Sequence, residues 1–529
     1  MNLTNEPWIP VRRADGSPDK IAPYQITDHV GTDKSPIVTV ASPRPDFDGA
    51  LVQFLIGLLQ TTCTPNTEGE WWDWREQPPT SEKLNARFEA VGFAFELEGE
   101  KAFMQDFSPK ELENELPISA LLIDSPGDQS IDHNKDHFVK RGRCDFLCPH
   151  CSVMALMTMQ INAPAGGRGY RTSLRGGGPL TTLVLGSNLW ETCWSNTLEK
   201  TRYLGDEAQH KPVDSDRFPW LAKTRTSKAK PPAGITTPVD VHPDHIFWAT
   251  PRRVRLIMED FSSPVFCSLC SNIGQRMCRG LSTTNYGANY QNFKHGLSPY
   301  YVKDGASNPV HPQPGGIGYR HWLGLIESST DGNMYREPAR VIEQYRNLTQ
   351  EDGRLWAFGY DMDNMKARCW YDATMPIMIV PKGQEGIFKG LVEKTVQAAH
   401  WVCGIIRGRI KDALFGDSDT RGDLSFIQLH FWNHTEAAFY SHARQLRDVL
   451  GEQEKENQIL ESWRTALQKS ALAIFDHYAQ FGDFDYVDPR TIAVARNDLG
   501  KTLNGKKLRA MLGLPQPDRK AKKSQRKTQ

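Results

Sequence analysis

The rhythm of hydrophobic and polar positions divides the chain near residue 385. Before that point, short apolar runs such as 35–41, 178–186 and 375–380 alternate with loops that contain proline and glycine. This punctuation is typical of short strands joined by turns. One longer stretch, residues 48–59, predicts an amphipathic helix. The first part of the chain is therefore expected to be a large, irregular mixed α/β domain, residues 1–385.

From Gly386 onward the apolar positions recur at helical spacing, every three or four residues. They are Ile387, Leu391, Val392, Val396, Ala399, Val402, Ile405, Ile406 and Ile410. Further helical stretches are predicted at 437–450, 458–475 and 504–512, and glycine and proline are rarer here. The pattern predicts a helical bundle over residues 386–515, so the fold class is α+β. Residues 516–529 are rich in lysine and arginine and are expected to form a disordered basic tail.

Length and charge limit the possible functions. A chain of 529 residues exceeds one ordinary core, so two or three domains are expected. Lysine plus arginine equals aspartate plus glutamate at 63 each, which argues against nucleic acid wrapped over the whole surface but permits local basic loops. The first residues do not form a signal-peptide pattern and no stretch reaches the length of a membrane span. We therefore expect a cytoplasmic protein without a membrane partner.

Two C-x-x-C units carry the strongest chemical signal. They are Cys148-Pro-His-Cys151 and Cys267-Ser-Leu-Cys270. Four thiolates from two such turns complete a tetrahedral zinc shell without a position for water, which predicts one structural zinc ion per chain. A redox dithiol or unrelated buried thiols are the alternatives. Three nearby residues could replace a ligand: Cys144, His137 and His150. Five isolated cysteines are expected to be core thiols: Cys63, Cys193, Cys278, Cys369 and Cys403.

A glycine-rich loop follows at residues 163–178. Glycine lets the main chain approach another surface closely, and the interleaved arginines suggest that this surface is polyanionic. The minor groove of DNA is one such target. Two ordinary turns around a strand are the alternative. The loop residues concerned are Gly166, Gly167, Arg168 and Gly169, with Arg171 and Arg175 after them.

Three polar clusters could belong to a metal-dependent nuclease, although none has the spacing of an established catalytic motif. Solvated turns and helix caps are the more ordinary interpretation of such clusters. The clusters are Asp361 with Asp363, Asp483 with Asp485 and Asp488, and His242 with Asp244 and His245.

Several of these motifs occur together in the order found in the CasA family, the large subunits of type I-E CRISPR Cascade complexes. Beside the two cysteine pairs, the chain resembles this family in four blocks: Pro7-Trp8-Ile9-Pro10-Val11, Asn162-Ala163-Pro164, Leu174–Thr182 and Phe358–Arg368. The resemblance spans nearly the whole chain. It implies a four-helix bundle at the C-terminal end and no catalysis by this subunit.

The resemblance also implies roles for individual residues. The glycine loop, Gly166 to Gly169, would contact the minor groove of the protospacer-adjacent motif (PAM). A wedge that opens the first target base pairs would consist of Asp363, Asn364, Met365 and Lys366, although some relatives have glutamine where this chain has Asn364. A loop that contacts the 5′ handle of the guide RNA and a neighbouring subunit would use Lys135, Phe138, Lys140 and Arg141. The family's basic residue beside the PAM has two candidates, Arg279 and Lys294.

The partners implied are the other Cascade subunits, the CRISPR RNA 5′ handle, double-stranded target DNA and a recruited helicase-nuclease. Two alternatives remain open from the residues alone: a zinc-stabilised metal-dependent nuclease, and a zinc-bearing interaction scaffold without nucleic-acid contact.

Overall fold

The computed structural model describes residues 1–108, 112–134, 142–167, 169–205, 213–331, 334–363, 366–415, 423–480 and 488–516. By their contacts these residues divide into two compact units. The first contains residues 1–313 and 325–374, and the second contains residues 314–324 and 375–529. The second unit thus takes in a segment from within the first part of the chain. Whether residues 1–385 and 386–515 are separate domains stays a prediction.

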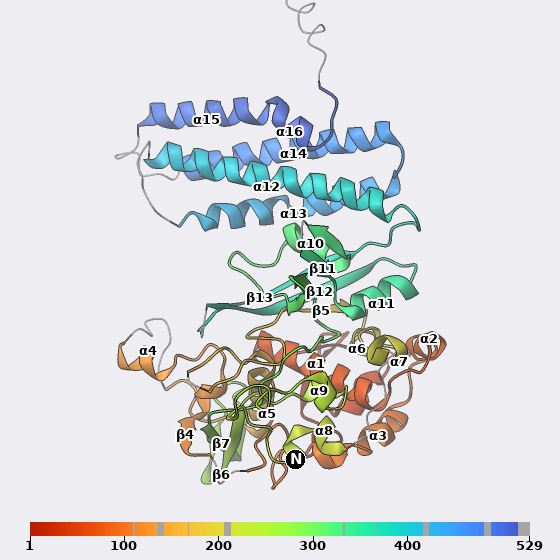
Figure 1. The fold of residues 1–529 in the computed structure, drawn as a ribbon, viewed down its shortest axis with the longest axis vertical. Coiled ribbons are helices and arrows are strands. Elements are labelled where there is room, and N and C mark those ends of the chain that lie inside the picture. The colour runs from red at the N-terminus through yellow and green to blue at the C-terminus, as the bar shows by residue number, and fades with distance from the viewer. Residues whose placement is uncertain are drawn as a thin grey trace, which may run out of the picture. The chain divides into compact units, whose positions relative to one another are not determined.

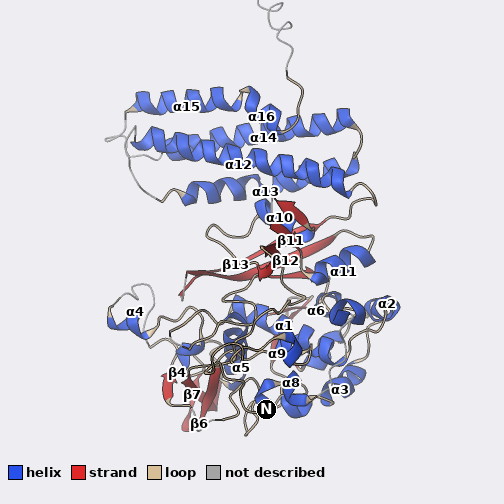
Figure 2. Ribbon diagram, in the orientation of Figure 1, coloured by secondary structure: helices blue, strands red, loops and turns tan. Residues whose placement is uncertain are grey.

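The first unit holds most of the strands, in small sheets (Figures 1 and 2). One sheet has the order β2-β1-β3, a second β4-β7-β6, a third β13-β12-β5 and a fourth β10-β11-β8-β9. The strands are β1 Ile9–Arg13, β2 Pro18–Ile21, β3 Ile37–Val40, β4 Asn114–Pro117, β5 Thr181–Leu185, β6 Arg253–Phe266, β7 Ile273–Thr284, β8 Tyr300–Lys303, β9 Ala306–Pro309, β10 Ser329–Asp331, β11 Met334–Glu337, β12 Gly353–Asp363 and β13 Lys366–Ile377.

Helices, most of them short, alternate with these strands along the chain. The helices up to residue 348 are α1 Pro45–Thr62, α2 Glu68–Glu76, α3 Ser81–Glu89, α4 Asp128–Asp132, α5 Pro149–Asn162, α6 Leu189–Ser195, α7 Lys200–Leu204, α8 Asp214–Arg217, α9 His245–Trp248, α10 Tyr319–Ile326 and α11 Arg340–Leu348. The sequence patterns did not predict most of them, because short helices capped by loops lack a long apolar stripe.

Helix α1 lies in the centre of the first unit. It contains the predicted segment 48–59, but its expected amphipathic character is wrong, since nearly every residue from Asp46 to Gln60 is buried. Phe54 contacts four aromatic rings with centroids 5.3–6.0 Å away, in edge-to-face geometry: Trp8, Phe95, Phe103 and Trp248. A helix that is buried on all its faces is a core helix, so other elements cover it on all sides.

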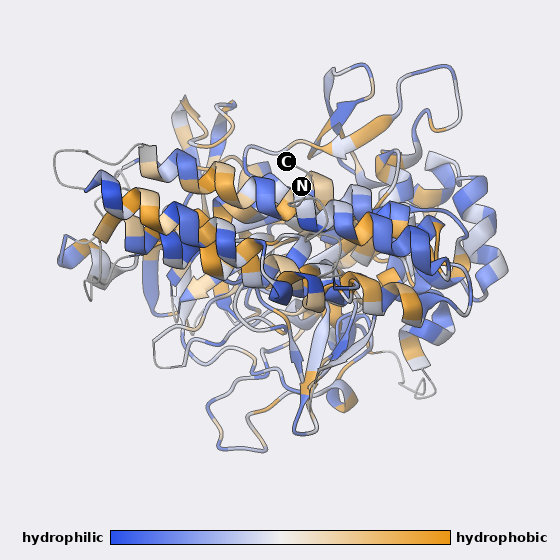
Figure 3. Ribbon diagram, turned by 90° about the horizontal axis from the view of Figure 1, so that it is seen from above, coloured by the Kyte–Doolittle hydropathy of each residue, from blue (hydrophilic) through white to orange (hydrophobic). Residues whose placement is uncertain are grey.

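The second unit confirms the predicted helical C-terminal region. Helices α12 Glu385–Phe415, α13 Ser425–Asp448, α14 Gln453–Gln480 and α15 Pro489–Leu503 pack against one another, and α16 Lys506–Met511 contacts α12. Apolar and polar residues alternate around the long helices (Figure 3). The core includes Trp463, whose indole N–H donates to the Thr395 carbonyl oxygen over 3.2 Å. Ile387, expected in the apolar stripe, is exposed. The basic tail beyond residue 516 lies outside the described residues.

Among the described helices, none combines the length and the apolar character that a bilayer crossing requires.

Candidate metal centre and glycine loop

The two C-x-x-C units meet in the first unit. Cys148 is the N-cap residue of α5 and Cys151 lies in its first turn, while Cys267 and Cys270 occupy the turn between β6 and β7. The segment before α5 runs beside β7, where the Leu147 and Cys278 main chains exchange hydrogen bonds of 3.0 and 2.8 Å. This pairing brings the distant cysteines together.

The geometry of the four sulfurs fits a tetrahedral zinc ion. All four lie within 4.8 Å of one another, and the Cys148 and Cys270 Sγ atoms are 3.6 Å apart. Sulfurs bonded to one zinc ion at about 2.3 Å lie about 3.8 Å from each other, whereas disulfide sulfurs are about 2 Å apart. Within the described residues no other group of three His, Cys, Asp or Glu is placed to hold a metal. The predicted alternative ligands, Cys144 and His150, are not in the group, and His137 lies outside the described residues.

The thiol pKa values show how crowded the sulfurs are. Hydrogen bonds from the thiols of Cys148 and Cys151 lower the pKa of Cys267. The pKa of Cys151 is raised, because its thiol donates to Cys148 and Cys267 and because it is buried. If all four thiols lost their protons, four negative charges would lie side by side, and a cation among them would be needed to stabilise them. A divalent metal ion supplies this positive charge.

The expectation that the isolated cysteines are core thiols holds for four of the five. Cys63, Cys193, Cys278 and Cys403 are buried. The expectation for Cys369 is wrong, since its side chain on β13 is exposed.

The glycine loop follows α5 and packs against two other segments. Tyr170 N–H donates to the Gly167 carbonyl oxygen over 3.1 Å, closing a turn. Gly169 has φ of 84°, and its carbonyl oxygen accepts from Tyr286 N–H over 2.8 Å. A Cβ on Gly166 would lie 2.3 Å from Cβ of Tyr170, whereas one on Gly167 would meet nothing within 4 Å. Arg168 lies outside the described residues.

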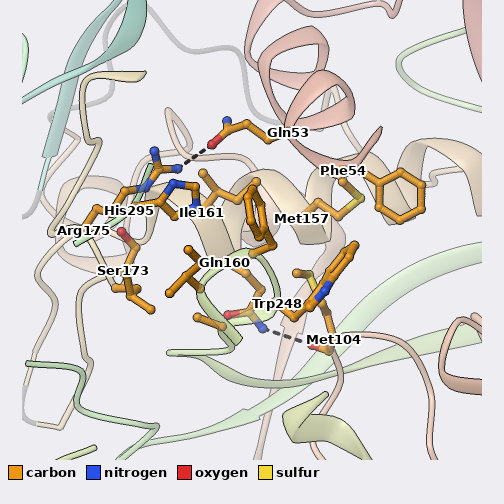
Figure 4. A pocket seen from close by; sticks show the side chains of 14 residues that line it. Gln53, Phe54, Met104, Met157, Gln160, Ile161, Ser173, Arg175, Trp248 and His295 are labelled. Atoms are coloured by element: carbon orange, nitrogen blue, oxygen red, sulfur yellow. Dashed lines mark hydrogen bonds between the residues drawn. The ribbon is translucent and has the colours of Figure 1, made fainter. Parts of the chain in front are cut away.

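Three interleaved arginines, Arg168, Arg171 and Arg175, were expected to face a polyanion, and for Arg175 this expectation is wrong. Its side chain is buried and donates to Thr181 Oγ1 over 3.0 Å, to Ser298 Oγ over 2.9 Å and to Gln53. Figure 4 shows Gln53 and Arg175 pointing toward each other within a small cavity. Burial lowers the pKa of Arg175 to about 10. Arg171 is half-buried and donates to Ser227 Oγ over 2.8 Å.

The second glycine cluster joins the loop to the β12–β13 hairpin. Gly178 N–H donates to the Asn162 carbonyl oxygen at the end of α5 over 3.2 Å. A Cβ on Gly178 would lie 2.7 Å from both Cβ and the carbonyl oxygen of Tyr360 on β12, and one on Gly177 would lie 3.1 Å from Cα of Pro164. The base of the glycine loop and the base of the hairpin are therefore packed together through main chain.

The hairpin ends at the residues predicted as a wedge. Asp363 and Lys366 are exposed at the ends of β12 and β13, and Asn364 and Met365 lie outside the described residues. The Asp361–Asp363 pair faces a cation of its own chain, because Arg368 approaches Asp361 to 2.7 Å and Asp363 to 3.5 Å. These carboxylates are ion-paired rather than grouped for a metal.

The other polar clusters are built into structure. Asp244 contacts Arg217 at 2.9 Å and accepts from Tyr203 over 2.9 Å, while His245 is buried against Tyr290. Asp488 caps α15, accepting from Arg490 N–H. Asp483 and Asp485 lie outside the described residues, as do all four residues of the predicted guide-handle loop: Lys135, Phe138, Lys140 and Arg141.

Neither candidate for the predicted basic residue beside the PAM carries an unpaired charge. Arg279 pairs with Glu259 at 2.9 Å and Lys294 with Glu337 at 2.8 Å. The segment that does touch the glycine loop after the second cysteine pair is neutral, since Asn285 and Tyr286 lie against Gly169. A further contact, Arg252, was missed because its position, four residues after the end of α9, belongs to no motif.

Comparison with known proteins decides the family. The sequence model of the family described as CRISPR-associated protein Cse1 matches residues 2–474. The chain belongs to the Cse1 family. Since one solved structure bears both names, "Thermus thermophilus CasA (Cse1)", the predicted CasA resemblance is confirmed.

Solved Cse1 structures share the fold over nearly the full chain. The Thermus thermophilus CasA structure is 18% identical, with a TM-score of 0.65, covering 95% of this chain and 99% of that one. Thermobifida fusca Cse1 is 15% identical, with a TM-score of 0.68 and coverage of 97% and 98%. A chain from a structure titled "CRISPR RNA-guided surveillance complex" is 17% identical, with a TM-score of 0.65 and coverage of 96% and 99%.

Proposed function

We propose that this Cse1 family member is the large subunit of a type I-E CRISPR RNA-guided surveillance complex, and that it recognises the PAM in double-stranded target DNA through the minor groove. Family membership supports the first part, together with the likeness to a chain of a surveillance complex. The observation that carries the second part is the shared base of two projecting elements. The loop around Gly167 and the hairpin ending at Asp363 and Lys366 meet at Gly177 and Gly178.

This arrangement suits recognition followed by strand opening. A loop of bare main chain fits the narrow minor groove, whose pattern of donors and acceptors is degenerate, so several related PAMs are tolerated. The hairpin tip, residues 363–366, then acts as the wedge at the first base pairs. Separating a DNA step costs on the order of 1–2 kcal/mol, which guide pairing recovers, so the wedge need only hold the first step open. Since loop and hairpin share a rigid base, docking of one positions the other.

The remaining roles complete the proposal. The guide-handle loop at residues 135–141 contacts the CRISPR RNA and a neighbouring subunit, and a separate helicase-nuclease recruited to the complex cleaves the DNA in the cytoplasm. The four cysteines hold one zinc ion. Its role is structural, because a complete shell of four thiolates leaves no position for water or substrate.

We propose that the subunit itself cleaves no bond. The pairing of Asp361 and Asp363 with Arg368 supports this, since carboxylates occupied by a guanidinium are poor ligands for catalytic Mg²⁺. The nuclease alternative is tested by incubating the purified subunit with plasmid and Mg²⁺ or Mn²⁺. Cleavage that Asp361→Ala abolishes would establish the nuclease instead.

The test of PAM recognition is Gly167→Leu. A Cβ at this position would meet nothing within 4 Å among the described residues, so folding is expected to be unaffected while approach to the groove is blocked. Gly169 is a poorer probe because its φ is positive and its Cβ would lie 3.0 Å from Cβ of Asn285. We expect the assembled complex to lose at least about tenfold in affinity for a PAM-containing duplex, the cost of roughly one lost contact in the groove.

The matched control is Gly318→Leu, at another glycine with open space around it. It should bind like the wild type. Binding of single-stranded target, which needs no duplex opening, should be unchanged in both variants. If Gly167→Leu binds the PAM duplex with wild-type affinity and the same preference over a PAM-less duplex, the loop does not lie in the groove.

A further inference from the structure

Arg252 is held beneath the glycine loop by its own main chain. It precedes β6, its N–H donates to Gln160 Oε1 over 3.0 Å, and its carbonyl oxygen accepts from Gln160 Nε2 over 3.1 Å. Gln160 belongs to α5, two residues before the helix ends and the loop begins. The backbone of Arg252 is thus tied to the same helix that starts the loop.

The side chain of Arg252 closes the loop at both ends. Its Nη2 donates to the Pro164 carbonyl oxygen before the glycines, and the guanidinium stacks on the ring of Tyr170 after them, with its carbon 4.8 Å from the ring centroid. Its Nη1 atom would lie 3.3 Å from a Cβ on Gly166. Arg252 is only 9% exposed, so its guanidinium is largely shielded from solvent.

The charge of Arg252 is not compensated within the described part of the chain. Its buried Nη1 finds no hydrogen-bond acceptor among the described residues, and no carboxylate there forms an ion pair with it. The two other buried arginines have oxygen acceptors. Arg253 contacts Asp106 at 2.6 Å, and Arg175 donates to three oxygen atoms.

A buried cation without an anion is unfavourable, and such groups call for an explanation. Burial lowers the pKa of Arg252 to about 10, which still leaves the guanidinium protonated at neutral pH. Because Gly166 and Gly167 have no side chains, an anion lying on the loop is separated from this charge by little more than one layer of main chain. In such a low-dielectric setting the attraction is weakly screened.

We propose that Arg252 is a positioning residue that holds the glycine loop closed and supplies the buried positive charge for a phosphate of the DNA backbone lying across Gly166 and Gly167. The inference deepens the proposed function by adding a contact to the backbone, independent of base sequence, next to the groove readout. It rests on that function only in assuming that duplex DNA lies on the loop.

The test compares Arg252→Met and Arg252→Lys in the assembled complex, with PAM-containing and PAM-less duplexes over a series of salt concentrations. Methionine keeps an unbranched apolar stem over Tyr170 and removes the charge, whereas lysine keeps the charge and loses the planar fork. For Arg252→Met we expect both duplexes to bind about tenfold more weakly at low salt. The slope of log affinity against log salt should fall by about one, as for a lost phosphate contact. Arg252→Lys should keep the wild-type slope.

Arg276→Met is the matched control, because this arginine of β7 is paired with Glu98 and with Asp260 at 2.7 Å. It should leave the slope unchanged. Thermal unfolding of each variant shows whether the fold is kept. Wild-type binding by Arg252→Met overturns the inference. So does weaker binding with an unchanged slope in both Arg252 variants, which would mean that only loop shape matters. A loss confined to the PAM duplex would assign Arg252 to the bases instead. Equal binding of both duplexes by the wild type would refute the proposed PAM recognition, while the slopes would still decide the role of Arg252.

Discussion

Removing one cysteine of the metal centre provides the sharpest test of its structural role. Cys270→Ser is the mildest choice, since Cys270 is the most exposed of the four and its loss leaves little packing defect. Zinc held by both pairs cross-links positions 122 residues apart, Cys148 and Cys270. For a closed loop of this length, the loss of chain entropy in the unfolded state is worth about 5 kcal/mol at 25 °C. Any zinc that stays on a single pair in the unfolded chain reduces this value, so a loss of about 3–5 kcal/mol is expected.

The measurement must report on the first unit, because the two units need not unfold in a single transition. Hydrogen–deuterium exchange of peptides from β6 and β7 reports the opening free energy of the cross-linked region, and elemental analysis gives the zinc content. Cys144→Ser, a half-buried cysteine outside the group, is the control and should change the opening free energy by less than about 1 kcal/mol. Cys270→Ser protein that retains one zinc per chain and opens as rarely as the wild type would refute the four-thiolate site.

Three further perturbations follow from the structure. Gly178→Ala places a Cβ 2.7 Å from the main chain of Tyr360 at a φ of 60°, and should cost at least about 1–2 kcal/mol in thermal or urea unfolding; an unchanged midpoint would contradict the packed junction. Asp106→Ala removes the carboxylate that contacts the buried Arg253, so the free energy of unfolding of the first unit should fall by about 3–5 kcal/mol, and a loss below about 1 kcal/mol would show that the pair is not essential. His245 is buried, and burial lowers its pKa to about 4; because the unfolded chain binds this proton more readily, stability is present above pH 6.5 and is lost as pH falls from about 6.5 to 4. In His245→Gln, the free energy of unfolding by urea should therefore fall less steeply between pH 6.5 and pH 4 than in the wild type. Loss of zinc at low pH affects both proteins equally. Parallel pH dependences in the two proteins would contradict this role of His245.

Local patterns predicted the cysteine cluster and the helical region better than they predicted which side chains are buried. The C-x-x-C spacing identified all four cysteines, because two thiolates on one turn are a local feature. The helical C-terminal region was also predictable, since its apolar stripe repeats over many turns. By contrast, nothing local distinguishes Arg175, which is buried against three acceptors, from an arginine that faces solvent.

The errors share a physical cause: burial is decided by partners distant in sequence. Helix α1 looked amphipathic, yet its polar residues Asp46, Gln53 and Gln60 are buried as well. Cys369 looked like a core thiol but lies on an exposed face of β13. Arg252 belongs to no motif, and its importance follows only from where α5, Pro164 and Tyr170 place it.

The glycine junction at residues 176–178 separates positions that resist amino-acid substitution from positions in the glycine loop and the β12–β13 hairpin that tolerate it. Side chains are excluded at Gly178, where a Cβ would meet main chain, whereas a Cβ on Gly167 would meet nothing within 4 Å among the described residues. Relatives can therefore change the length or the charge of the loop tip and of the hairpin tip during evolution without moving the glycine junction that both share. Under the proposed function, new target-site preferences would then arise by exchanging a few protruding residues, while the geometry proposed to couple PAM reading with duplex opening is inherited unchanged.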